Sequence, residues 1–219
     1  MPRSVRRITR RVEDVPSGSY LVAGADGVHS AVRRRLWGPW AKATPIPFLA
    51  VRGDGANWYA SFRSGLSPDQ VDVNEALELT RHLYAGHSAA VRQILAQATP
   101  ETSLAQRIWT MPALGRYSRE GAVLLGDAAH AMTPNLGRGA CEALVDAVTL
   151  GQLLNENPRE EALAKYNKLR VLPTQQIKAA SALMGRMALA DPMQPLRDAL
   201  VKQVGRHTPR RPSAAGTRE

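Results

Sequence analysis

The segment from Gly121 to Ala147 restricts the fold more than any other part of this 219-residue chain. An apolar run ends abruptly at Gly126–Asp127, a turn of small residues and Pro134 follows, and Gly137–Arg138–Gly139 opens a helix. A strand, a tight turn and a glycine-opened helix bring one carboxylate and several backbone N–H groups beside one ligand. The pattern predicts a site for a polar cofactor with hydroxyls and negative charge. The alternative is a plain strand–loop–helix connection in which Asp127 caps a helix.

A second segment, residues 21–33, repeats this design. A short buried-strand candidate ends in Gly24–Ala25–Asp26–Gly27, and a helix is expected from about Ser30. We expect Ala31, Val32 and Leu36 to face inward and Arg33 to Arg35 to face outward. Alone, this segment is equally compatible with an ordinary strand–helix turn, but the two segments together are more specific than either one.

Both segments resemble motifs of one enzyme family. Residues 24–33, GADGVHSAVR, are similar to the "DG" motif of FAD-dependent group A monooxygenases, the aromatic-ring hydroxylases related to para-hydroxybenzoate and salicylate hydroxylases. Residues 126–140, GDAAHAMTPNLGRGA, are similar to their "GD" motif. The resemblance covers most of residues 5–185 and is weak over 40–70. It implies an α/β (α+β) fold: a partial FAD-binding three-layer domain, a reduced antiparallel substrate sheet and a long C-terminal helix.

The resemblance also implies roles for residues. Asp127 would bind the ribityl and pyrophosphate region of FAD. Gly137, Arg138 and Gly139 would lie at the pyrimidine edge of the flavin, where the helix dipole stabilises charge near N1 and O2. Asp26 and Gly27 would lie near the pyrophosphate and the path of NAD(P)H. The predicted cofactor-binding residues are Asp26, Gly27, Gly126, Asp127, Pro134, Gly137, Arg138 and Gly139.

In the cycle implied by the resemblance, NAD(P)H reduces FAD, O2 forms a flavin C4a-hydroperoxide, and one oxygen atom enters a small aromatic or polyketide-like substrate. The flavin carries this chemistry, whereas the protein positions it and excludes water. No catalytic residue is assigned. The second interpretation is a non-catalytic family remnant acting as an interaction module, and the third is a polyanion-binding protein that uses its basic ends.

The chain also departs from the family pattern. The family's N-terminal βαβ unit carries G-x-G-x-x-G and grips the adenine side of FAD. This sequence contains no such motif, so we expect roughly a hundred or more residues to be missing before Met1. We therefore expect the chain alone to bind FAD weakly or not at all unless a partner polypeptide supplies that unit. Arg138 replaces the usual Gln, and Val145 stands where an acidic residue is common.

Shifts in composition predict five regions. They are the DG part of the FAD-binding domain (1–37), the reduced substrate domain (38–115), the GD part (116–157), the C-terminal helix (158–190) and a basic tail (191–219). A strand is expected over 5–15, before the DG motif. Within the substrate domain we expect strands at 48–51, 58–62 and 104–109, and a helical segment over 72–98 that breaks near Gly86.

Two helices are expected after the GD turn. In the first, Ala140, Leu144, Ala147, Val148 and Gly151 fall at helical spacing, whereas Glu142, Asp146 and Gln152 are polar. The second runs from about Glu160 to about Leu189, with a kink at Pro173.

Other residues carry weaker signals. We expect His130 to be a packed or solvent-facing turn histidine rather than a base, and Cys141 to serve packing. Four tryptophans suit core or interface burial better than a substrate pocket: Trp37, Trp40, Trp58 and Trp109. The other histidines lack ligand-like spacing with carboxylates, so no metal is predicted.

The net charge of +10 lies almost entirely at the ends. Residues 1–11 contain five arginines and no acidic residue, and residues 201–219 contain five basic residues and one acidic residue. Solvated tails are favoured over nucleic-acid binding, although basic ends can bind polyanions. The Arg-rich start also resembles an organelle transit peptide.

One cysteine excludes a disulfide framework and fits a reducing cytoplasm, where we expect the protein. No apolar run reaches the roughly 18 residues that a membrane span needs.

Overall fold

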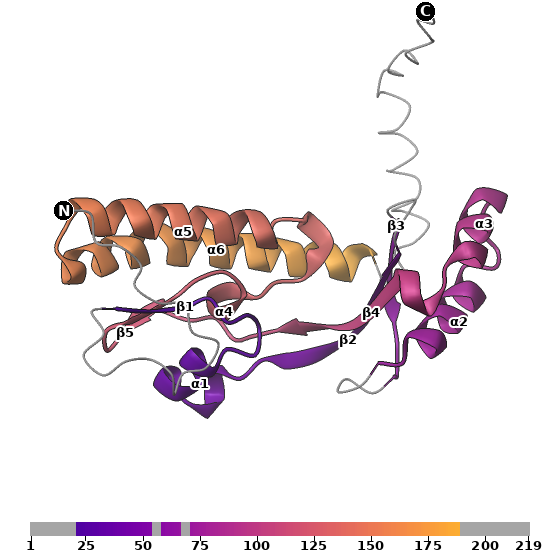
Figure 1. The fold of residues 1–219 in the computed structure, drawn as a ribbon, viewed down its shortest axis with the longest axis horizontal. Coiled ribbons are helices and arrows are strands. Elements are labelled where there is room, and N and C mark those ends of the chain that lie inside the picture. The colour runs from indigo at the N-terminus through magenta and orange to yellow at the C-terminus, as the bar shows by residue number, and fades with distance from the viewer. Residues whose placement is uncertain (1–20, 54–57, 67–70, 189–219) are drawn as a thin grey trace, which may run out of the picture.

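Two three-stranded sheets organise the part of the chain that the computed structural model describes, residues 21–53, 58–66 and 71–188 (Figure 1). One sheet has the strand order β1-β6-β5, and the other has the order β3-β2-β4. Helices pack on both sheets, so the predicted mixed α/β class is confirmed.

The first sheet brings the two motifs together. β1 (Val22–Gly24) pairs in parallel with β6 (Ala122–Leu124), and the short β5 (Ser118–Arg119) pairs with β6 in antiparallel orientation. All of β6 is buried, as expected for an apolar run at the centre of a partly parallel sheet. Because β1 and β6 are parallel, the turns that follow them lie at the same edge of the sheet.

The second sheet confirms the strands expected in the substrate region. β2 (Thr44–Gly53) pairs in antiparallel orientation with β3 (Trp58–Arg63) and with β4 (Ser103–Thr110). The expected helical segment is also confirmed: α2 (Val73–Leu83) and α3 (Ala89–Gln97) are separated around Gly86. A shared apolar core joins α2 to this sheet: Leu49, Val51, Ala60, Phe62, Ala76, Leu77, Ala98 and Ala105.

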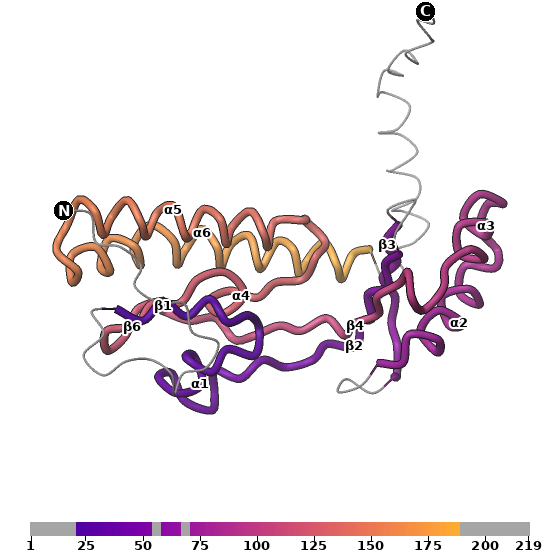
Figure 2. The backbone as a smooth tube through the Cα atoms, viewed as in Figure 1, coloured from indigo at the N-terminus to yellow at the C-terminus, as the bar shows by residue number. Residues whose placement is uncertain are grey.

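Two long helices cover the first sheet. α5 (Gly139–Glu156) and α6 (Arg159–Ala188) run side by side along it (Figure 2). Both predicted helices are confirmed, and Pro173 lies inside α6. The hydroxyl of Tyr166 donates a hydrogen bond of 3.2 Å to the carbonyl of Leu124 and fastens α6 to β6. None of the described helices is long and apolar enough to cross a membrane.

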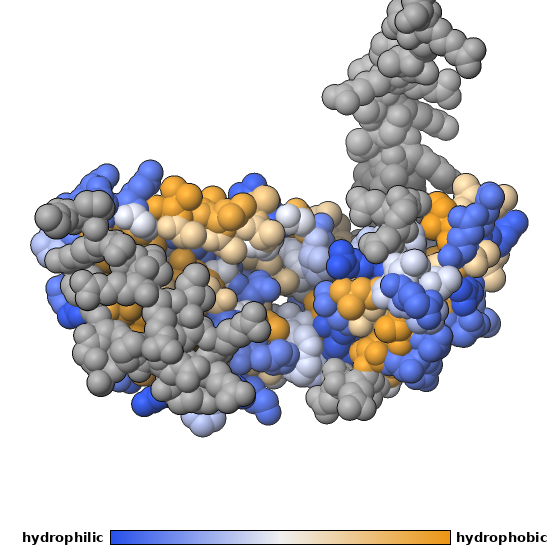
Figure 3. All heavy atoms as spheres, viewed as in Figure 1, coloured by the Kyte–Doolittle hydropathy of each residue, from blue (hydrophilic) through white to orange (hydrophobic). Residues whose placement is uncertain are grey.

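The start of α5 presents a face that its apolar residues do not predict. Leu144 and Val148 are 69% and 59% exposed, whereas Glu142 and Asp146 are buried. Apolar surface therefore lies along the outside of α5 (Figure 3). Cys141, expected to serve packing, is exposed, so that expectation is wrong. The reason is that α5 turns its carboxylates toward a cation on α6.

The helix α1 (Ala31–Trp37) begins where expected, with the hydroxyl of Ser30 accepting from the amide of Arg33. The expected direction of two side chains is wrong. Arg33 is fully buried rather than outward, because backbone carbonyls satisfy its donors, and Ala31 is exposed rather than inward. Of the tryptophans, Trp37 is buried but Trp40 is exposed, against the expectation of burial.

Some expectations fall outside the described residues. These are the strand at 5–15, the Arg-rich start and the basic tail over 191–219. The five domain boundaries stay predictions.

Candidate cofactor cleft

The turns after β1 and β6 border one cleft of about 590 Å³, here called the cofactor cleft. It is lined by Ala25, Gly27, Leu125, Gly126, Asp127, Met132, Thr133, Pro134, Gly137, Gly139, Ala140, Ala143 and Ala147. Six of the eight residues predicted to bind a cofactor are in this set. Most of the lining is glycine, alanine and backbone, so a ligand can approach the main chain closely.

The first wall of the cleft is the turn at Gly126–Asp127. Gly126 has φ of 56°, and a Cβ there would lie 2.9 Å from the Cβ of Ala143. Only glycine fits, because the backbone is left-handed and α5 packs directly against it. The turn starts the short helix α4 (Asp127–His130), and the Asp127 side chain is exposed at the cleft.

The second wall is the turn that leads into α5. The 3₁₀ helix η4 (Pro134–Leu136) ends at Gly137, which has φ of 63°. α5 then begins at Gly139, and its N-cap residue Arg138 makes no side-chain capping bond. The first amides of a helix have no partner within it, and the helix dipole makes this end attractive to partial negative charge.

The other two predicted residues do not line the cleft. The Asp26 carboxylate accepts from the amides of Ala31 and Val32 at 2.7 and 3.2 Å, so it caps α1. The Arg138 guanidinium donates to Oε1 of Glu142 at 2.5 and 3.1 Å. Their binding of a cofactor stays a prediction, and the geometry gives both side chains structural partners.

Arg33 connects the turn that follows β1 to α4, the short helix that follows β6. Its Nε donates to the carbonyl of Ala41 at 2.7 Å, and its Nη1 donates to the carbonyl of Ala128 in α4 at 2.8 Å. Its Nη2 bonds the carbonyl of Val28. Burial lowers the pKa of the Arg33 guanidinium, and the charge of Asp26 opposes that shift. The guanidinium therefore holds α1 and α4 in a fixed relation.

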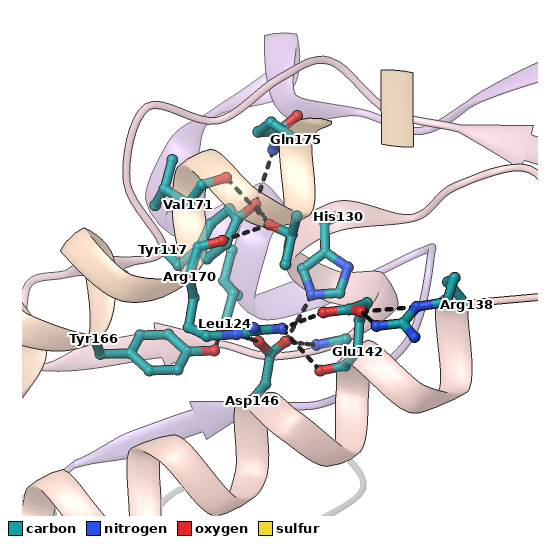
Figure 4. A network of polar contacts seen from close by, with 12 residues as sticks. Tyr117, Leu124, His130, Arg138, Glu142, Asp146, Tyr166, Arg170, Val171 and Gln175 are labelled. Atoms are coloured by element: carbon teal, nitrogen blue, oxygen red, sulfur yellow. Dashed lines mark hydrogen bonds and ion pairs between the residues drawn. The ribbon is translucent and has the colours of Figure 1, made fainter. Parts of the chain in front are cut away.

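A group of ionisable side chains joins α4, the start of α5 and α6, and is here called the ionic cluster (Figure 4). It comprises His130, Arg138, Glu142, Asp146 and Arg170. Oδ2 of Asp146 lies 2.8 Å from the Gly126 amide and 2.6 Å from Nε2 of His130. Burial alone raises the pKa of the Asp146 carboxyl, but hydrogen bonds from His130, Gly126 and Arg170 outweigh it, so the pKa is lowered.

Glu142 completes the ionic cluster. Its Oε2 accepts from Nη2 of Arg170 at 2.7 Å, while its Oε1 accepts from Arg138. Burial works against ionisation of Glu142, yet the two arginines lower its pKa and keep it charged. His130 is fully buried, so of the two expected forms the structure shows a packed histidine; that it is not a base stays a prediction.

Sequence reasoning missed three members of the cluster and also Arg33. Glu142 and Asp146 stand four residues apart inside a largely apolar helix, and that spacing is the one signal that could have indicated them. Arg170 lies 24 residues beyond Asp146, and no local pattern connects the two.

Comparison with known proteins agrees with this geometry. Residues 72–180 match the family model described as a FAD binding domain. The chain belongs to the family of FAD-dependent monooxygenases. The resemblance inferred from the two motifs is confirmed, and FAD is the cofactor of this family.

Relatives of this chain include two bacterial enzymes. It is 30% identical over 199 residues to 2-heptyl-3-hydroxy-4(1H)-quinolone synthase of Pseudomonas aeruginosa, covering 76% of this chain and 51% of that protein. It is 31% identical over 199 residues to 3-hydroxybenzoate 6-hydroxylase of Polaromonas naphthalenivorans, covering 75% and 49%. The chain thus spans about half the length of the curated relatives it matches.

Solved structures share the fold. Klebsiella pneumoniae HpxO complexed with FAD and uric acid superposes with a TM-score of 0.69 at 22% identity, covering 86% of this chain and 56% of that one. At this identity the comparison shows a shared fold and no more.

Proposed function

We propose that this chain supplies the flavin cleft of a monooxygenase that uses NAD(P)H and O2 to hydroxylate a small aromatic substrate. One observation carries the proposal: two separate motifs, about a hundred residues apart, border a single cleft. The first motif contributes Ala25 and Gly27 to the lining, and the second contributes the Asp127 carboxylate and the uncapped start of α5.

The lining fits FAD chemically. A volume of about 590 Å³ lies within the range of cofactor and ligand sites. The Asp127 carboxylate would accept hydrogen bonds from the ribityl hydroxyls. Amides of the first turn of α5 would stabilise negative charge on the pyrimidine edge of the ring system. Bound FAD would supply the redox chemistry that amino-acid side chains lack.

The protein's own residues would hold the reaction site. Arg33 fixes α4 from below, and Asp146 fixes the Gly126 amide, so Asp127 is presented from a rigid turn. Leu125, Ala143 and Ala147 contribute apolar surface that would exclude water from the bound ring system. The detailed route of oxygen activation stays a prediction.

The names of relatives support an aromatic substrate. They refer to a quinolone, a hydroxybenzoate and urate, all small planar ring compounds. We extend that chemical class to this chain, with NAD(P)H as the reductant and the cytoplasm as the place of action. A non-catalytic role as an interaction module is the less favoured candidate, because the open cleft keeps its carboxylate and both glycine turns.

Tight FAD binding would also require a unit with a G-x-G-x-x-G motif, which this sequence does not contain. Among the described residues, β1 pairs only with β6, so its other edge can accept a further parallel strand. A partner polypeptide or a further segment of a longer protein would serve equally.

The test is a FAD titration of the purified full chain, followed by the visible flavin absorption band. It is repeated with a co-purified βαβ unit that carries G-x-G-x-x-G. We expect saturable binding, strongest with that unit, and NAD(P)H oxidation that consumes O2 when an aromatic substrate is added.

Asp127→Ala should weaken FAD binding, whereas Glu156→Ala, an exposed acid at the far end of α5, should not. A folded protein that binds no FAD under either condition would contradict the proposal. Flavin binding without any NAD(P)H oxidation would favour the interaction module.

A further inference from the structure

The structure points to a role for Arg170, a residue on α6 that does not line the cofactor cleft. We propose that Arg170 is a positioning residue that fixes the turn at Gly126–Asp127 and the turn at Gly137–Gly139, the two walls of the cleft, relative to each other. Its importance for FAD rests on the proposed function, but its structural effect can be measured without any ligand.

The Arg170 guanidinium lies between two carboxylates of like charge. Glu142 and Asp146 are one helical turn apart on α5, and both side chains are almost completely buried. Two carboxylates at this spacing repel each other. The Arg170 guanidinium compensates this repulsion, because its Nε donates to Oδ1 of Asp146 and its Nη2 donates to Oε2 of Glu142, each at 2.7 Å.

Arg170 fixes the first wall of the cleft through Asp146. With Oδ1 of Asp146 held by Arg170, the other oxygen faces the Gly126 amide at 2.8 Å and Nε2 of His130 at 2.6 Å. Gly126 is the N-cap of α4, the helix that begins with Asp127, and His130 is its last residue. The orientation of Asp146 therefore fixes the turn that presents the Asp127 carboxylate.

Arg170 fixes the second wall of the cleft through Glu142. Glu142 lies in the first turn of α5, where its amide donates to the carbonyl of Arg138 at 2.9 Å. Arg170 also donates to the Glu142 carbonyl at 3.3 Å. Arg170 thus anchors the helix start that follows Gly137. Its guanidinium contacts Asp146, which holds the first wall, and Glu142, which lies in the second wall (Figure 4).

Arginine suits this position and lysine does not. A planar guanidinium can donate to two carboxylates in fixed directions, whereas an ammonium is a single point charge. α6 has other anchors, including the Tyr166 bond to Leu124 and the contact of Thr174 with the Tyr117 hydroxyl at 2.6 Å. Arg170→Lys should therefore keep α6 in place while loosening the two turns.

The experiment is amide hydrogen exchange on the full chain, without FAD, for wild type, Arg170→Lys and Glu142→Gln. The reference amide is that of Val51 in the other sheet, and Arg186→Lys on the exposed side of α6 is the matched control. We expect exchange at Gly126 and Glu142 to become about tenfold faster or more in Arg170→Lys, with Val51 unchanged. Glu142→Gln should speed exchange at residue 142 more than at Gly126. The reason is that it disturbs the contact of Arg170 with residue 142 and leaves the contact of Arg170 with Asp146 in place.

A FAD titration of the same variants gives the functional readout. Arg170→Lys should weaken FAD binding about tenfold or more, and Arg186→Lys should leave it unchanged. If wild type binds no FAD, the proposed function fails while the exchange result still decides the role of Arg170. Unchanged exchange at Gly126, an equal rise at Val51, or loss of the fold in both variants would overturn the inference.

Discussion

The two halves of the described chain are stabilised in different ways. Around β2, β3, β4 and α2, apolar side chains such as Leu77 fill the core, and the helix follows the usual amphipathic pattern. Around the cofactor cleft, Arg33, Glu142 and Asp146 are buried while Leu144 is exposed. Directional polar bonds between buried charged groups therefore add to an apolar core around the cleft, whereas the other sheet depends mainly on non-directional burial.

The largest effect should come from breaking the ionic cluster. Arg170→Met would leave the buried carboxylates of Glu142 and Asp146 with no shared cation. We expect a loss of about 3–5 kcal/mol in the free energy of unfolding, measured by urea denaturation. A loss below about 1 kcal/mol would show that the cluster stabilises no more than a surface pair does.

The apolar half should respond to a cavity. Leu77→Ala on α2 removes a side chain that is 1% exposed, and we expect a loss of about 2–5 kcal/mol in the same assay. The control is Leu83→Ala on the same helix, where the side chain is 46% exposed. Equal losses in the two variants would contradict the packing assigned to α2.

A smaller effect is expected at the turns. Gly126→Ala combines a left-handed backbone with a contact of 2.9 Å to the Ala143 side chain. It should therefore lower the free energy of unfolding by more than about 1–2 kcal/mol. Gly137→Ala has a similar φ but open space around it and should cost about 1 kcal/mol. Thermal unfolding of both variants checks this order, and a reversal would contradict the close packing of α5 on the first turn.

The smallest effect near neutral pH should be the acid sensitivity of the cleft half. The pKa values of Asp146 and Glu142 are lowered on folding, so their stabilisation is complete above the ordinary carboxyl pKa of about 4. It is lost as pH falls below that value through the lowered ones. Near-ultraviolet circular dichroism should follow this loss. In Asp146→Asn, the circular dichroism signal should depend less steeply on pH. An unchanged profile in that variant would contradict the assignment.

The same contrast explains what the sequence could predict. The strands at 48–51, 58–62 and 104–109 and the break near Gly86 follow from local apolar patterns, and the structure confirms them. The cleft-lining glycines were predictable because each turn is local to its own strand and helix. Arg33 and the cluster were not, because their partners lie up to 95 residues away in sequence and face them only after folding.

In the function we propose, the turns at Gly126–Asp127 and Gly137–Gly139 together bind FAD. The most direct measurement is a titration of the isotope-labelled full chain with FAD, supplemented by the G-x-G-x-x-G unit, read at individual backbone amides. We expect saturable shifts at Gly126, Asp127, Gly137 and Gly139, with the amides of β2 and β4 unaffected. Saturable FAD binding that leaves these four amides unchanged would contradict it.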